Sequence, residues 1–146
     1  MTLTIDACVW LAALSPAEPD HAACADLLHM AVAEGLALHQ PTLFVIEVCA
    51  TIARRTRDPA LAASVGDTIV ATPGLTLHPL DHAGSAHAAE VAMTCALRGA
   101  DAIYVATARA LQATLISLDH EVLDRAASST AVMSPDAWLA SRRARR

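Results

Sequence analysis

Residues 99–108, GADAIYVATA, and residues 115–119, LISLD, constrain the fold more than any other part of the chain. The first segment predicts a helix of about 12 residues beginning at Asp101, because its apolar side chains repeat with helical spacing and Gly99 precedes them. The second segment is short and apolar, which indicates a buried strand. Such a helix rises roughly 17 Å, and a five-residue strand returns by roughly the same length. Asp119 is therefore expected at the level of Asp101.

Helices and strands alternate along the rest of the chain. Strands are expected at residues 2–5, 36–39, 75–80, 114–118 and 131–133, and further helices at 7–14, 20–34, 41–55, 59–71, 82–97 and 135–141. This alternation is typical of the α/β class, with a mainly parallel sheet covered by helices on both faces. We expect a sheet of four or five strands.

The composition indicates one soluble domain. A chain of 146 residues can bury one core, so we expect a single domain at residues 1–141 and a basic tail at 142–146. The four cysteines form no C-x-x-C pair and are expected to be reduced core residues of a cytoplasmic protein. No apolar run reaches the ~18 residues of a membrane span, so no membrane partner is expected.

The basic side chains are all arginines. The formal net charge of −5 argues weakly against nucleic acid as a partner, but the arginines are concentrated in two places. One group is Arg54, Arg55 and Arg57, and the other lies in residues 142–146. Because the planar guanidinium matches phosphate, the first group is a candidate RNA-binding site. A solvated helix face explains either group equally well.

Four carboxylates are expected at one edge of the sheet. Asp6 follows the first strand, Glu47 lies early in the helix after the second, and Asp101 and Asp119 come from the stretch described first. Each one alone could be a helix cap or a solvated side chain. Together they would repel one another unless a cation lay between them, and an oxygen-only set suits Mg²⁺ or Mn²⁺. Such an ion can activate a water for attack on a phosphodiester.

These segments resemble one known family. The matching pieces are IDA at residues 5–7, Pro41 to Val48 with Arg54 after it, DAIYVATA at 101–108 and ISLD at 116–119. Together they resemble the PIN-domain ribonucleases, and among these the VapC-like toxins of type II toxin–antitoxin systems. The family usually has Asn or Ser at the position of Cys8, which removes one expected hydrogen bond.

The resemblance implies a three-layer α/β/α sandwich and a metal-dependent endoribonuclease, a hydrolase that cuts RNA. It implies that Asp6, Glu47, Asp101 and Asp119 are catalytic residues and hold Mg²⁺ or Mn²⁺, with Ser117 steadying a carboxylate or a metal-bound water. It further implies RNA as the substrate, a small antitoxin protein as a partner, and a homodimer.

Other kinds of site have less support in the sequence. A mixed zinc site around His87 and Glu90 lacks the H-E-x-x-H spacing, and neither G-K-[ST] nor G-x-S-x-G occurs. A phospho-receiver domain would need a lysine, and the chain has none. Asp124 is expected to face solvent. The alternative that stays open is a catalytically idle PIN-like domain that acts as a binding or scaffold module.

Overall fold

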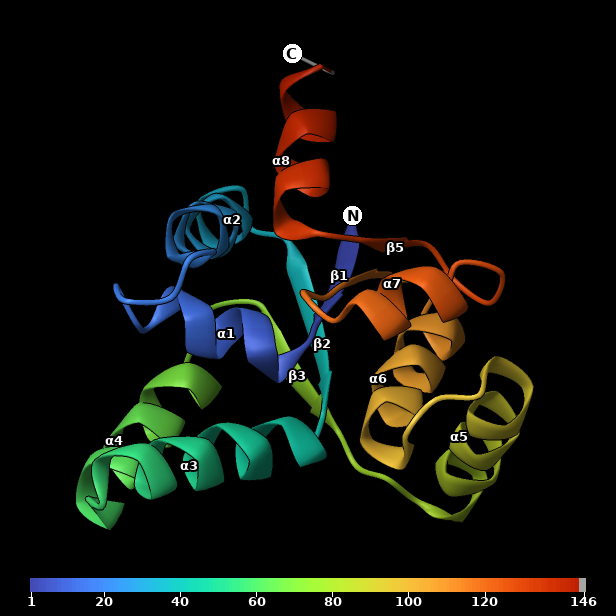
Figure 1. Ribbon diagram of the computed structural model, residues 1–146, viewed down its shortest axis with the longest axis horizontal. Coiled ribbons are helices and arrows are strands. Elements are labelled where there is room, and N and C mark those ends of the chain that lie inside the picture. Colours follow the sequence, from blue (N-terminus) through green and yellow to red (C-terminus); the bar gives the residue numbers. More distant parts are fainter. Residues whose placement is uncertain (145–146) are drawn as a thin grey trace.

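The computed structural model describes residues 1–144 and shows one five-stranded sheet in which every pairing is parallel (Figure 1). The strands are β1 (Thr2–Ile5), β2 (Ala37–Pro41), β3 (Leu75–His78), β4 (Thr114–Ile116) and β5 (Val132–Met133). Their order across the sheet is β3-β2-β1-β4-β5. The predicted α/β class and the mainly parallel sheet of four or five strands are confirmed.

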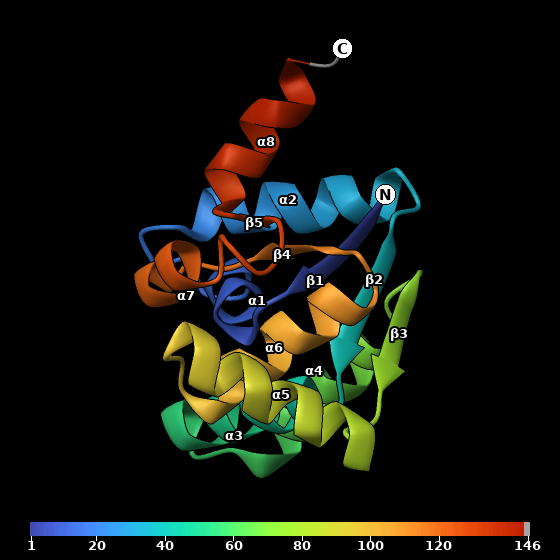
Figure 2. The ribbon, with the colours of Figure 1, turned by 90° about the vertical axis from the view of Figure 1, so that its right-hand side faces the viewer.

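Helices cover both faces of the sheet. They are α1 (Ala7–Ala13), α2 (His21–Ala33), α3 (Leu43–Thr56), α4 (Pro59–Val70), α5 (His82–Cys95), α6 (Gly99–Ala110), α7 (His120–Arg125) and α8 (Pro135–Arg143). Figure 1 shows α1 to α4 on one side of the sheet and α5 to α7 on the other. Figure 2 shows α6 lying across the central strands, and α8 rising from α2, with which it is in contact. The result is the expected α/β/α sandwich.

The core lies on the two faces of the central strands. Leu3, Ile5, Leu38, Leu115 and Ile116 are all 0% exposed. Both faces of β1 and β4 are buried, because Thr4, which alternates with the apolar residues of β1, is also 0% exposed, and Leu115 and Ile116 are consecutive in β4. Among residues 1–144, no helix is long and apolar enough to cross a membrane.

The structure corrects the start of the helix that carries Asp101. Helix α6 begins at Gly99, two residues earlier than predicted, and its N-cap is Arg98 in an extended conformation with no side-chain capping bond. Glycine therefore does not break the chain here but occupies the first helical turn. Asp101 is not an N-cap, so capping does not account for its presence.

The predicted basic tail begins inside a helix. Arg142 and Arg143 belong to α8, and Arg142 is paired with Glu34 of the α2 C-cap. Residues 145–146 lie outside the part of the chain that the structure describes. The division at residue 141 stays a prediction.

Candidate functional site

Two of the predicted acids lie side by side because their strands are neighbours. β1 and β4 pair in parallel with Ile5 beside Ile116, and the Asp6 backbone N–H donates to the Ile116 carbonyl over 2.9 Å. Asp6 is the N-cap of α1, and Asp119 is the N-cap of α7. Both helices therefore start at the carboxyl edge of the sheet, where open α/β folds bind ligands.

Ser117 connects these two acids. Its hydroxyl donates to Asp6 Oδ2 over 2.7 Å and accepts from the Asp119 backbone N–H over 3.0 Å. The Ser117 residue is 0% exposed, so the hydroxyl is fixed between its two partners. This contact orients the Asp6 carboxylate relative to the β4–α7 connection.

Cys8 contacts both Asp6 and Ser117. Its backbone N–H donates to Asp6 Oδ1 over 3.2 Å, and its Sγ lies 3.9 Å from the Ser117 hydroxyl. Burial, and then the charge of Asp6, raise the pKa of the Cys8 thiol. The thiol is therefore neutral at physiological pH and behaves as a small packing group.

Asp101 reaches the same place from α6. It lies in the first turn of that helix, and its Oδ2 is buried with no hydrogen-bond partner within residues 1–144. Burial, and then the charges of Asp6, Asp119 and Glu47, raise the pKa of Asp101 to about 6, against the opposing charge of Arg98. Asp101 thus lies within electrostatic range of the other three predicted acids.

Glu47 is held by a residue that the sequence analysis did not single out. The Tyr104 hydroxyl donates to Glu47 Oε2 over 2.6 Å, and Tyr104 is only 2% exposed. Burial raises the pKa of Glu47 and the Tyr104 bond lowers it, while burial and Glu47 raise the pKa of Tyr104. Tyr104 stands three residues after Asp101, which places both on one face of α6. This three-residue spacing from Asp101 is the feature of the sequence that could have indicated Tyr104 as part of the site.

The donor set has the chemistry of a Mg²⁺ or Mn²⁺ site. Four carboxylates on four elements affect one another electrostatically, and one of their buried oxygens is unpartnered. Within residues 1–144, however, no three His, Cys, Asp or Glu side chains are arranged to hold a metal as they stand. Three of the acids already accept hydrogen bonds within the protein. Asp6 accepts one from the Ser117 hydroxyl, Glu47 accepts one from the Tyr104 hydroxyl, and Asp119 accepts one from the Glu121 backbone N–H. Side-chain rotation would therefore have to accompany binding.

The predicted RNA-binding arginines lie away from these acids. Arg54 and Arg55 are exposed in the last turn of α3, about 10 Å along the helix from Glu47 at ~1.5 Å per residue. Arg55 pairs with Glu18 over 2.9 Å, and Arg57 is the left-handed C-cap. Arg98, which the sequence analysis missed, is exposed and affects the pKa of Asp101.

Comparison with known proteins gives a family match. Residues 3–128 match the PIN domain model. A comparison with curated protein sequences finds no match.

Solved structures have the same fold at low identity. VapBC2 from Rickettsia felis, bound to a DNA fragment from its promoter, is 12% identical with a TM-score of 0.71, over 92% of this chain and 98% of that one. FitAcB from Neisseria gonorrhoeae is 18% identical with a TM-score of 0.71, over 91% of this chain and 97% of that one. VapC20 from Mycobacterium tuberculosis, a sarcin-ricin loop cleaving toxin, is 15% identical with a TM-score of 0.70, over 88% and 96%.

Proposed function

Since the chain belongs to the PIN-domain family, we propose that it is a metal-dependent endoribonuclease and the toxin of a toxin–antitoxin pair. One observation carries this proposal: a buried, unpartnered oxygen on Asp101, whose pKa three other carboxylates raise. Carboxylates gathered in this way are destabilising without a cation, and helix capping accounts for Asp6 and Asp119 but not for Asp101.

In this proposal Asp6, Glu47, Asp101 and Asp119 hold Mg²⁺ or Mn²⁺. When bound, the ion would lower the pKa of a water and stabilise charge in an in-line attack on an RNA phosphodiester. The chain's own groups set the positions of these acids. Ser117 orients Asp6 through its hydroxyl, and the Tyr104 phenol orients Glu47 and opposes the rise in its pKa that burial causes.

Phosphate contacts would come from the exposed arginines. Arg54, Arg55 and Arg57 form one group at the end of α3, and Arg98 lies beside Asp101. Arginine contacts with phosphate position a strand without reading its sequence. We place the RNA backbone between these groups, across the carboxyl edge of the sheet.

A small antitoxin protein is the proposed partner, and the proposed location is the cytoplasm. Support for the antitoxin partner comes from the solved structures of similar fold, which include VapBC and FitAB assemblies. The proposed homodimer rests on the family resemblance alone.

The test is cleavage of single-stranded RNA by purified protein in Mg²⁺ or Mn²⁺, with and without EDTA. Asp101→Asn should abolish cleavage, because it removes the carboxylate that the other three surround. Asp124→Asn, on an exposed residue of α7, is the matched control and should cleave like wild type. Equal cleavage by both variants would contradict the proposed site. Metal and RNA binding without cleavage by wild type would support the idle binding module instead.

A further inference from the structure

Two histidines contact each other at the edge of the sheet, away from the acids. His39 lies on β2 and His78 on β3, where His78 stands beside Pro41 in the register. His39 and Pro41 are two residues apart, so His39 and His78 point to the same face of the sheet. His39 Nδ1 and His78 Nε2 are 2.6 Å apart, and both residues are half-buried.

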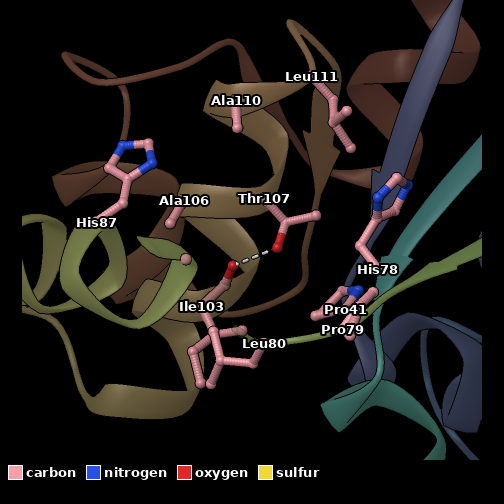
Figure 3. Close-up of a pocket in the computed structure, with 11 residues that line it drawn as sticks. Pro41, His78, Pro79, Leu80, His87, Ile103, Ala106, Thr107, Ala110 and Leu111 are labelled. Carbon is pink, nitrogen blue, oxygen red and sulfur yellow. Dashed lines mark hydrogen bonds between the residues drawn. The ribbon is translucent and has the colours of Figure 1, made fainter. Parts of the chain in front are cut away.

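His78 of this pair lines a cavity of about 160 Å³ between α5, α6 and the sheet edge. Figure 3 shows His78 on one wall and His87 of α5 on the opposite wall, with Thr107 of α6 between them. One water occupies about 30 Å³ in the liquid, so the cavity has room for several waters beside the histidine pair. Its contents are therefore able to complete a coordination shell.

We propose that His39 and His78 form a site for a borderline divalent transition metal, of the class of Zn²⁺ and Ni²⁺. Imidazole nitrogens favour these ions, whereas carboxylates favour Mg²⁺ and Mn²⁺. With metal–nitrogen bonds of about 2.1 Å and a tetrahedral angle, the two nitrogens would be about 3.4 Å apart. The two nitrogens need to separate by only about 0.8 Å from their present distance of 2.6 Å. The proton between them moves to the other nitrogen of the donor ring, so that both facing nitrogens can bind the metal.

The protonation of His39 favours binding. A metal binds the neutral imidazole, and a short contact between two ring nitrogens requires one to donate and the other to accept. Burial, and then the neighbouring His78, lower the pKa of His39, which favours its neutral ring. Two protein ligands are fewer than a structural zinc site uses, so the ion would exchange readily.

This site is separate from the acids and does not rest on the proposed nuclease function. Ile103 and Thr107 line the cavity from α6. Ile103 is two residues after Asp101, which is a rotation of about 200° around the helix. The cavity and the Asp101 carboxylate therefore lie on opposite faces of α6.

The experiment uses Ni²⁺ as the probe, because Ni²⁺ favours imidazole while Zn²⁺ also binds thiolates and the chain has four free cysteines. Protein without an affinity tag, stripped of metal and kept in excess Mg²⁺, is titrated with Ni²⁺ by calorimetry. Wild type should bind one Ni²⁺ per chain. His39→Gln/His78→Gln should bind at least tenfold more weakly, while the control His29→Gln/His82→Gln, which removes two exposed histidines, should match wild type.

A second measurement on wild-type protein avoids dependence on how the variant folds. Substoichiometric Ni²⁺, which is paramagnetic, should broaden the ring signals of His39 and His78 in a histidine NMR spectrum before those of other histidines. Equal affinity in the two double variants, or broadening that begins at other histidines, would overturn the proposal. Neither result would bear on RNA cleavage by the acids.

Discussion

The phenol of Tyr104 lies 2.6 Å from the carboxylate of Glu47 and joins two helices at positions 57 residues apart in the chain. The bond connects α3, which carries Glu47, with α6, which carries Asp101. Two of the four candidate ligands therefore depend on one buried side chain for their relative position.

Tyr104→Phe should destabilise the protein by about 1.5 kcal/mol, the typical contribution of a hydrogen bond to a charged group. The pKa of Glu47 should rise further, because the phenol is the group that lowers it. Urea unfolding at pH 7 measures the first effect, and a carboxyl-carbon NMR titration measures the second. An unmoved Glu47 titration would show that the bond does not persist in solution.

Metal-free protein should lose stability as the pH rises from about 4 to about 6. The pKa of Asp101 is raised from 3.8 to about 6 in the folded state. The contribution of its bound proton is thus complete below 3.8 and is lost as the pH passes through the folded-state pKa. Thermal unfolding in EDTA across this range measures the effect. Asp101→Asn should remove this pH dependence, and at pH 7 it should melt higher than wild type.

Divalent metal should restore the stability lost at pH 7. At a hundredfold excess of Mg²⁺ or Mn²⁺ over Kd, mass action gives about 2.7 kcal/mol. Asp101→Asn should gain less than wild type, and Asp124→Asn should gain as much. If neither ion moves the melting temperature of wild type, the four acids do not bind metal.

Arg54→Ala/Arg55→Ala should weaken RNA binding and reduce its dependence on salt. For a single strand, each phosphate contact contributes about 0.7 to the steepness of log K against log salt concentration. The slope for the double variant should therefore be shallower than that of wild type by about 1.4. Arg109→Ala, at an exposed arginine in the last turn of α6, is the control. A slope equal to that of the control would mean that the end of α3 is only a solvated face.

Loss of the exposed Arg55–Glu18 pair should cost at most about 1 kcal/mol of stability.

Local pattern was sufficient to predict the layers of this fold, because apolar runs, prolines and glycines mark most element boundaries. It failed at the start of α6, where Arg98 precedes the helix without a capping bond and no cap residue marks the boundary. At the start of α2, predicted from residue 20, Asp20 is the N-cap but makes no side-chain capping bond.

The neighbourhood of the acids was less predictable than the acids themselves. Strand order brings Asp6 close to Asp119, and parallel-sheet rules reduce the possible orders to a few without choosing among them. The choice of Tyr104 as the partner of Glu47 depends on how α3 and α6 pack, and the contact between His39 and His78 depends on strand register. Neither packing angle nor register is encoded in a short motif.

The central place of β1 in the sheet has a consequence for biosynthesis. β1 is made first, yet it pairs with β4 on one side, and Asp119 is translated 113 residues after Asp6. At ~5–20 residues per second, roughly 6 to 23 s separate the two acids on the ribosome. During that interval β1 can pair with β2 on one side only, and the set of carboxylates is incomplete. Under the proposed function, a ribosome-bound chain would lack Asp119, and with it the complete site, until four of the five strands have been synthesised.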